Sequence, residues 1–202
     1  MNIKREIIPF TTEEAWLSNR VHDLTSSDVP CLFGVGYQSY DELLEHKRTK
    51  ILPNILSNER MDWGIALQDS IAKEFARKHN WKIGKKTEYI RIPELRLGSS
   101  FDWEIEDSDE NRKNNGLLEI KNVSLDAYKK WITGFEIQMS PYIEIQVQHQ
   151  LLVSGLTWCN VGALIAGCEG KVIQRTPNKK IQDAILFKAR EFWQRVDEMR
   201  KT

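Results

Sequence analysis

We expect the chain of 202 residues to form a single α/β domain, residues 1–202, with a central mixed β-sheet flanked by helices. Apolar residues recur with the period of helices early in the chain and at its end, whereas between about residues 87 and 122 they follow the period of strands. No internal repeat, low-complexity tract or linker rich in Pro, Gly or Ser divides the sequence. Helical and strand segments in one undivided chain are typical of a layered α/β domain.

Three helices are expected before the strands. Thr11-x-x-Glu14 has the pattern of a capping box, in which a hydroxyl and a carboxylate bond the free N–H groups at a helix start. Ser39-x-x-Glu42 repeats this pattern and predicts a second helix. The third helix is expected over residues 61–79, where one stripe carries Gly64, Leu67, Gln68, Ile71 and Phe75.

Two paired strands are expected in the middle of the chain. One covers residues 97–101 and ends at Asp102, and the other covers residues 117–121. The stretch 106–116 between them is almost wholly polar and ends in Asn-Gly, a dipeptide typical of tight turns. The sequence therefore predicts a hairpin loop that joins the two strands.

A further helix, a second hairpin and a last helix are expected in the remaining third. Ser140 before Pro141 predicts a helix start, although the apolar alternation over residues 143–147 would also suit a strand. Segments 157–166 and 171–176 flank residues 167–170 and predict the hairpin. An amphipathic helix is expected over residues 178–200, with apolar side chains at Ile181, Ile185, Ala189, Phe192, Val196 and Met199.

Composition argues against several classes of protein. Hydrophobic residues make up 41% and charged residues 29% of the chain, no apolar run approaches the length of a membrane span, and the N-terminus lacks a signal-peptide core. Cys31, Cys159 and Cys168 form no C-x-x-C pair, which favours reduced cytoplasmic thiols over a zinc or iron–sulfur framework. The 29 basic and 29 acidic residues cancel, so the net charge does not reveal the partner.

Asp102, Glu119 and Lys121 are the most informative residues for function. Glu119 and Lys121 lie two residues apart in an expected strand and therefore share a face, onto which a paired neighbour can bring Asp102. Two hard oxygen ligands and one ammonium around a single point suit Mg²⁺-dependent cleavage of phosphodiesters. The alternative is a solvated strand face, because Glu-x-Lys is a common string.

Four segments carry a resemblance to a known family. They are Trp16-Leu17-Ser18-Asn19-Arg20 leading to Thr25-Ser26-Ser27-Asp28, Trp63-Gly64 with Leu67-Gln68, Ser100-Phe101-Asp102 with Glu119-Ile120-Lys121, and Gln146-Val147-Gln148-His149-Gln150. In this order and spacing they resemble the lambda-type (YqaJ-like) viral recombination exonucleases of the PD-(D/E)XK nuclease superfamily. The resemblance covers about residues 16–155 and implies one nuclease domain with a restriction-endonuclease-like core.

The resemblance implies a catalytic role for five residues. Asp102 and Glu119 would be the metal ligands, with the backbone carbonyl of Ile120 as a third. The metal would be Mg²⁺, with Mn²⁺ as a possible substitute. Lys121 would orient or deprotonate the attacking water, and Gln148 would line the active site.

Substrate-binding roles are implied for four more residues. Arg20 would grip a terminal 5′-phosphate with the hydroxyl of Ser27 nearby, and Gln146 would line the site. Gln68 stands where the family usually has a glutamate, and it would hold a metal-bound water or a phosphate oxygen. The plainer alternatives are a surface arginine, helix-capping hydroxyls and an exposed polar helix face.

The implied function is a Mg²⁺-dependent 5′→3′ exonuclease that resects double-stranded DNA ends and leaves 3′ single strands for phage-type recombination. The family further implies a homotrimer that works beside a single-strand annealing protein, in the cytoplasm of a bacterium that carries the phage or prophage. Two alternatives stay open: another PD-(D/E)XK endonuclease, and a catalytically silent DNA-end-binding or structural protein of the same fold. The intact Asp102, Glu119 and Lys121 argue against silence.

Overall fold

The computed structural model describes residues 3–51, 58–106, 115–133 and 136–201. Its helices are α1 (Glu13–Arg20), α2 (Tyr40–Thr49), α3 (Glu59–His79), α4 (Leu125–Lys129), α5 (Pro141–Ser154) and α6 (Lys179–Met199), with the 3₁₀ helices η1 (Val29–Phe33) and η2 (Pro93–Leu95). Its strands are β1 (Glu6–Pro9), β2 (Lys82–Lys85), β3 (Glu88–Ile92), β4 (Leu97–Ser99), β5 (Trp103–Glu106), β6 (Gly116–Val123), β7 (Ile132–Thr133), β8 (Glu136–Ile137), β9 (Cys159–Ile165) and β10 (Glu169–Arg175).

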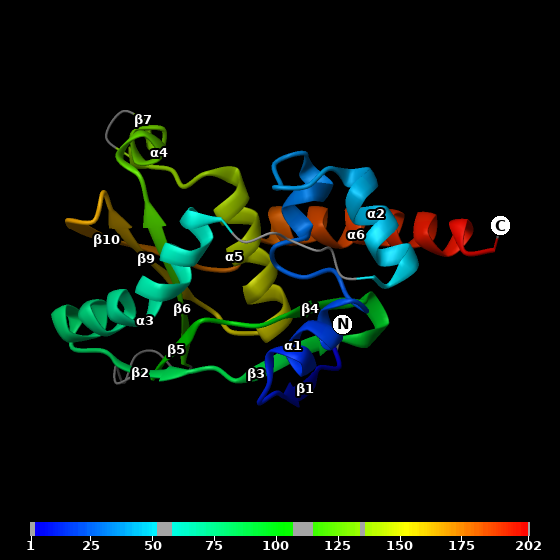
Figure 1. The fold of residues 1–202 in the computed structure, drawn as a ribbon, viewed down its shortest axis with the longest axis horizontal. Coiled ribbons are helices and arrows are strands. Elements are labelled where there is room, and N and C mark those ends of the chain that lie inside the picture. Colours follow the sequence, from blue (N-terminus) through cyan, green and yellow to red (C-terminus); the bar gives the residue numbers. More distant parts are fainter. Residues whose placement is uncertain (1–2, 52–57, 107–114, 134–135, 202) are drawn as a thin grey trace.

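The central sheet has the strand order β10-β9-β6-β5-β2 and is mixed, because β6 and β9 are parallel while the other neighbours are antiparallel. A smaller antiparallel sheet, β1-β3-β4, lies beside it (Figure 1). Strand β7 pairs with β8. The predicted fold class, a mixed sheet flanked by helices, is confirmed. None of the helices among the described residues is long and apolar enough to cross a bilayer.

Strand β6 divides the apolar core in two because its side chains alternate between the faces of the sheet. Leu118 and Ile120 belong to the cluster that contains Ile71 and Phe75 of α3. Leu117 belongs to the larger cluster on the other face, which includes the apolar side chains of α5. Glu119 and Lys121 lie two and four residues after Leu117, so their side chains point to the same face of the sheet as Leu117, towards α5.

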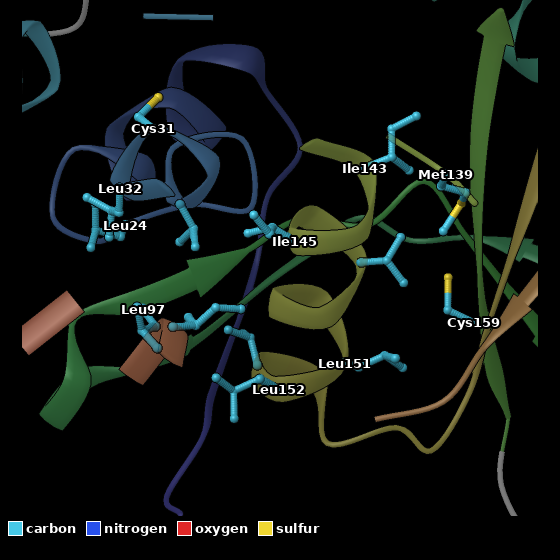
Figure 2. Packing of buried hydrophobic residues seen from close by; sticks show 14 of the residues in the cluster. Leu24, Cys31, Leu32, Leu97, Met139, Ile143, Ile145, Leu151, Leu152 and Cys159 are labelled. Atoms are coloured by element: carbon cyan, nitrogen blue, oxygen red, sulfur yellow. The ribbon is translucent and has the colours of Figure 1, made fainter. Parts of the chain in front are cut away.

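Helix α5 is buried on nearly all sides, which explains why its sequence pattern was ambiguous. Ten of its 14 residues are buried, so no exposed face gives the helix a polar stripe. Ile145 points towards Leu24 and Leu32, whereas Leu151 points towards Cys159 of β9 (Figure 2). The predicted cap is confirmed, because the Ser140 hydroxyl accepts a 3.4 Å hydrogen bond from the N–H of Ile143. The strand alternative is therefore wrong.

The other predicted helices are present with small shifts. The capping box of Ser39 and Glu42 is confirmed at the start of α2. At α1 the cap is Thr12 rather than Thr11, and α3 begins at Glu59 after an Asn58 cap, before the predicted start. The last helix, α6, agrees with its prediction to within a residue.

The predicted strands need two corrections. The strand expected over residues 97–101 is the short β4, which belongs to the smaller sheet. Asp102 therefore does not end this strand but directly precedes β5 of the central sheet. Gly116 is the first residue of β6 rather than part of a turn, and residues 107–114 of the expected loop lie outside the described residues. The second hairpin is confirmed, although its turn is shorter because β10 already begins at Glu169.

Candidate active site

The pairing of β5 with β6 places two carboxylates opposite each other. Trp103 pairs with Leu118 in this antiparallel register, so the next residues outward are Asp102 and Glu119. Directly opposed residues of an antiparallel pair carry their side chains on the same face. The N–H of Ile120 fixes the position by donating a 3.1 Å hydrogen bond to Oδ2 of Asp102. The structure thus brings the two predicted carboxylates together.

The buried carboxylate of Glu119 is held by three donors. Oε1 accepts hydrogen bonds from Nζ of Lys121 at 2.5 Å and from Nε2 of Gln146 at 2.9 Å. Oε2 accepts one from Nε2 of Gln150 at 2.7 Å. Because each oxygen has two lone pairs, Oε2 keeps one lone pair for a further partner.

The charges of this cluster are strongly coupled. Burial raises the pKa of Asp102 to about 7, and repulsion from Glu119 adds to this shift, against the opposing attraction of Lys121. Burial alone would lower the pKa of Lys121, but the attraction of Glu119 and Asp102 outweighs it and raises that pKa. Lys121 is therefore a stable cation that balances two carboxylates.

The donor set fits a magnesium-like cation. No group of three or more His, Cys, Asp and Glu side chains that could hold a metal occurs in the described ranges. Mg²⁺ needs no such cage, because it keeps several waters and is usually held by one or two carboxylates together with substrate phosphates. A cation between Asp102 and Glu119 would also relieve the repulsion that raises the pKa of Asp102.

Gln68 reaches this cluster from α3. Its side chain is half-buried, and its interaction with Asp102 lowers the pKa of that carboxyl and partly offsets the effect of burial. Its contact is the carboxylate itself.

Gln148 does not join the carboxylates, which corrects its expected place. Its Nε2 donates to Oε1 of Glu144 at 3.1 Å and to the carbonyl of Thr176 at 3.0 Å, and its Oε1 accepts from the N–H of Asn178 at 2.7 Å. The reason is helical geometry, because residues two apart in a helix point in different directions. Gln148 therefore ties α5 to the start of α6.

Gln150, rather than the predicted Gln148, joins Gln146 in the carboxylate cluster. It lies four residues after Gln146, so both amides emerge on one stripe of α5 and reach Glu119. Tyr142 lies one turn earlier on the same stripe, near Lys121. In a helix, the spacing of four between Gln146 and Gln150 indicates that these two amides share a face, so the sequence pattern could have identified Gln150.

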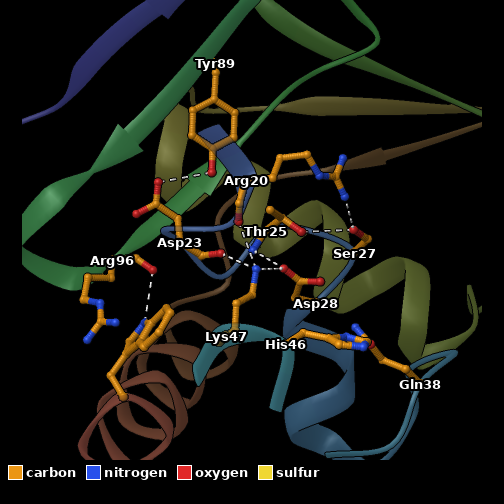
Figure 3. Close-up of polar contacts among 11 residues, drawn as sticks. Arg20, Asp23, Thr25, Ser27, Asp28, Gln38, His46, Lys47, Tyr89 and Arg96 are labelled. Atoms are coloured by element: carbon orange, nitrogen blue, oxygen red, sulfur yellow. Dashed lines mark hydrogen bonds and ion pairs between the residues drawn. The ribbon is translucent and has the colours of Figure 1, made fainter. Parts of the chain in front are cut away.

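The candidate phosphate-binding loop, defined as residues 24–28, follows α1. Nη2 of Arg20 donates a 2.9 Å hydrogen bond to Oγ of Ser27, which also lies 3.0 Å from Oγ1 of Thr25 (Figure 3). The Arg20 guanidinium stacks over Trp16 at 4.4 Å, and the Trp16 indole N–H donates to Ser100 at 3.0 Å. Because Ser100 lies two residues before Asp102, the loop is connected to the carboxylate cluster.

Buried charges hold this loop from behind. Nζ of Lys47 lies 2.9 Å from Oδ2 of Asp28 and donates to the carbonyls of Arg20 and Asp23 at 2.9 and 2.7 Å (Figure 3). Oδ2 of Asp28 also accepts from the N–H of Thr25 at 2.9 Å. These bonds fix the backbone of the loop, and the Arg20 side chain remains half-buried and partly accessible to solvent.

Comparisons with known proteins identify the family. A family model described as the YqaJ-like viral recombinase domain matches residues 15–157. That match covers Arg20, both carboxylates, Lys121 and Gln150. A search of curated proteins found no match.

Solved structures show the same fold. The crystal structure of LHK-Exo in complex with dAMP matches with a TM-score of 0.70 at 17% identity, over 93% of this chain and 94% of that chain. The alkaline exonuclease LHK-Exo from Laribacter hongkongensis, in a second crystal structure, gives 0.70 at 16% identity over the same shares. A phage-related exonuclease from Haemophilus somnus 129PT gives 0.57 at 12% identity, over 91% of this chain and 99% of that chain. At these identities the likeness establishes the fold, and it confirms the expected PD-(D/E)XK-like core.

Proposed function

The chain belongs to the YqaJ-like viral recombinase domain family, and from this premise we propose that it is a metal-dependent deoxyribonuclease that digests double-stranded DNA ends in the 5′→3′ direction. The observation that carries the proposal is the opposition of Asp102 and Glu119 beside the Lys121 ammonium. The LHK-Exo complex supports the exonuclease reading, because dAMP is a mononucleotide of the class that stepwise cleavage would release.

Asp102 and Glu119, with the carbonyl of Ile120, would hold Mg²⁺ or Mn²⁺. The buried Oε1 atoms of Gln146 and Gln150 have no hydrogen-bond partner among the described residues, and they are available to accept from waters around a cation. When bound, such a cation polarises the phosphate and makes a coordinated water more acidic.

The residues of the chain would divide the remaining work. Lys121 orients the attacking water and balances negative charge on the scissile phosphate. Water attacks phosphorus, the bond to the 3′ oxygen breaks, and the released nucleotide takes up the proton at its new 3′-hydroxyl. The remaining strand then carries a 5′-phosphate, which Arg20 and Ser27 can bind as they bound the previous one. A site that reads a 5′-phosphate therefore suits repeated cleavage in one direction.

Sustained digestion would benefit from enclosure of the DNA, because a chain of zero net charge has little long-range attraction for it. We propose a homotrimer that leaves 3′ single strands for a single-strand annealing protein. Light scattering of the purified protein tests the trimer, and a monomer that still digests long duplexes processively would contradict it.

The direct test is incubation of the protein with linear and closed-circular duplex DNA of one sequence, with Mg²⁺, Mn²⁺ or EDTA. We expect linear DNA alone to be digested, only with metal, with release of mononucleotides from the 5′ end. Cleavage of the closed circle would favour the endonuclease alternative. Binding to ends without cleavage would favour the silent protein.

A further inference from the structure

A second basic site lies apart from the carboxylate cluster. It is a cavity of about 310 Å³ lined by Val21, His22, Lys50, Arg91, Arg96 and Arg200. None of these six described residues is Asp or Glu, and four of them are permanent cations. Neither the proposed metal ligands nor the phosphate-binding loop is among the lining residues.

The cavity forms where three helices end. Val21, Lys50 and Arg200 are the C-terminal caps of α1, α2 and α6. Cations at helix C-termini are stabilising in themselves, and Arg200 donates to the carbonyls of Lys47 and Arg48 at 2.6 and 3.1 Å. Stabilisation of the helix ends would by itself explain these cations. A ligand site therefore needs positive charge beyond what the helix ends require.

The positive charge exceeds what the neighbouring carboxylates compensate. Arg91 pairs with Asp23 at 2.8 Å, and Arg96 pairs with Asp197 at 2.9 Å. Nε of Arg91 is buried and has no partner among the described residues. Burial lowers the pKa of His22, and the positive charge of Lys50 is the next contribution in the same direction. The interior of this cavity is thus positive.

We propose that this cavity binds a phosphate group, from the backbone of DNA or from a free mononucleotide. The choice of phosphate rests on the proposed nuclease function, since both sources are present wherever DNA is digested. Planar guanidinium groups suit this ligand because each can donate to two phosphate oxygens at once, and Arg96 is held rigidly by stacking on Trp193 at 3.5 Å. The Lys50 ammonium adds a flexible donor at the rim.

The test compares Lys50→Gln, Arg200→Gln and the double variant with a matched control, the double substitution Lys180→Gln and Arg190→Gln, which removes two exposed charges on α6. Affinity for a 30-base-pair blunt duplex is measured with Ca²⁺ in place of Mg²⁺ across a salt series. We expect the cavity double variant to bind roughly tenfold more weakly and to lose about one unit of the salt slope. The control variant should keep the wild-type slope.

Calorimetry with dAMP and with inorganic phosphate separates the two sources. Loss of dAMP binding in the cavity variants would identify a mononucleotide site, whereas loss of duplex affinity alone would identify a backbone contact. If Arg200→Gln does not fold, Lys50→Glu is the deciding variant, because it reverses charge at an exposed position. Unchanged affinity for all three probes overturns the proposal.

The outcome is distinguishable from failure of the proposed function. A wild-type protein that cleaves no DNA, yet loses phosphate or duplex affinity on Lys50→Glu, refutes the nuclease and keeps this site. Conversely, normal cleavage with wild-type affinity in every cavity variant keeps the nuclease and refutes this site.

Discussion

Nε2 of Gln150 lies 2.7 Å from Oε2 of Glu119, opposite the oxygen that Gln146 and Lys121 hold. Together with the two donors on the other oxygen, this contact fixes the rotation of the carboxylate about its last bond. Partners that orient a metal ligand from outside the coordination shell typically contribute ten- to a hundredfold in metal affinity or activity. We therefore propose that Gln150 positions Glu119, one of the two proposed metal ligands.

Gln150→Leu should lower kcat by about tenfold or more while the KM for DNA stays close to wild type. The change removes the donor to buried Oε2 of Glu119 and should lower Tm moderately, although it also removes the buried Oε1 of Gln150, which has no partner among the described residues. Steady-state digestion of linear duplex and thermal unfolding, measured together, check this. Gln148→Leu is the matched control, since it breaks the bond to Asn178 and should lower Tm rather than kcat. A larger loss of kcat in the control would reverse the two roles.

Asp102→Ala and Glu119→Ala should abolish cleavage of linear duplex, because each removes one of the two proposed metal ligands. Lys121→Ala should cost on the order of a hundredfold or more, since it removes the cation that balances both carboxylates. Circular dichroism confirms that each variant is folded before its rate is compared. Near-normal cleavage by Glu119→Ala would falsify the site assignment.

Local chemistry made much of this architecture predictable from the sequence. Capping hydroxyls mark the start of α2 and α5, and the chain follows them because free N–H groups need acceptors. Glu119 and Lys121 share a face because side chains alternate along a strand, which the sequence predicts. The opposition of Asp102 to Glu119 comes from β5, a strand that the predicted hairpin did not contain.

Features that depend on distant segments could not be predicted. Strand β2 carries no clear alternation, and it pairs with β5 only because the fold places it at the sheet edge. The difference between Gln148 and Gln150 depends on which side of α5 meets β6, and a helix buried on nearly all sides gives no polar stripe to settle it. The basic cavity gathers side chains from five separate segments.

Arg20→Ala should slow digestion of 5′-phosphorylated ends far more than that of 5′-hydroxyl ends. Its guanidinium, held 2.9 Å from Ser27, can donate two charge-assisted hydrogen bonds to one phosphate. Initial rates on otherwise identical duplexes with the two kinds of end provide the measurement. Arg20→Lys is the control, because it keeps the charge and loses the fork, so it should recover only part of the preference. An equal loss on both substrates would leave Arg20 with a packing or general charge role.

The stability of the protein should fall below neutral pH because of His149. Burial lowers the pKa of this histidine to about 4, from 6.5, with Asp28 partly opposing the shift. Burial of the neutral His149 imidazole contributes fully to the free energy of unfolding above pH 6.5. This contribution is lost as the pH falls towards 4, because the unfolded chain then binds a proton that the folded chain excludes. The loss amounts to at most about 3 kcal/mol.

Urea unfolding of the wild type and His149→Phe at pH 7, 5.5 and 4.5 isolates this contribution. Acidic residues titrate in the same range, so the difference between the two proteins is the quantity of interest. We expect the wild type to lose stability more steeply than the variant. Parallel curves would show that the pH dependence has another source.

The resemblance implies a glutamate where this chain has Gln68, and the interaction of Gln68 with Asp102 makes the effect of that difference testable. Gln68→Ala should reduce the rate by roughly tenfold or more, since Asp102 loses a positioned neighbour. Gln68→Glu places a third carboxylate against Asp102, where repulsion already contributes to a pKa of about 7, so the metal-free protein should become less stable while Mg²⁺ binding tightens. Calorimetric titration with Mg²⁺, thermal unfolding without metal and the Mg²⁺ dependence of cleavage measure the three effects separately. If the wild type is inert at every Mg²⁺ concentration and only Gln68→Glu cleaves DNA, the amide has silenced the site, and the end-binding alternative replaces the exonuclease.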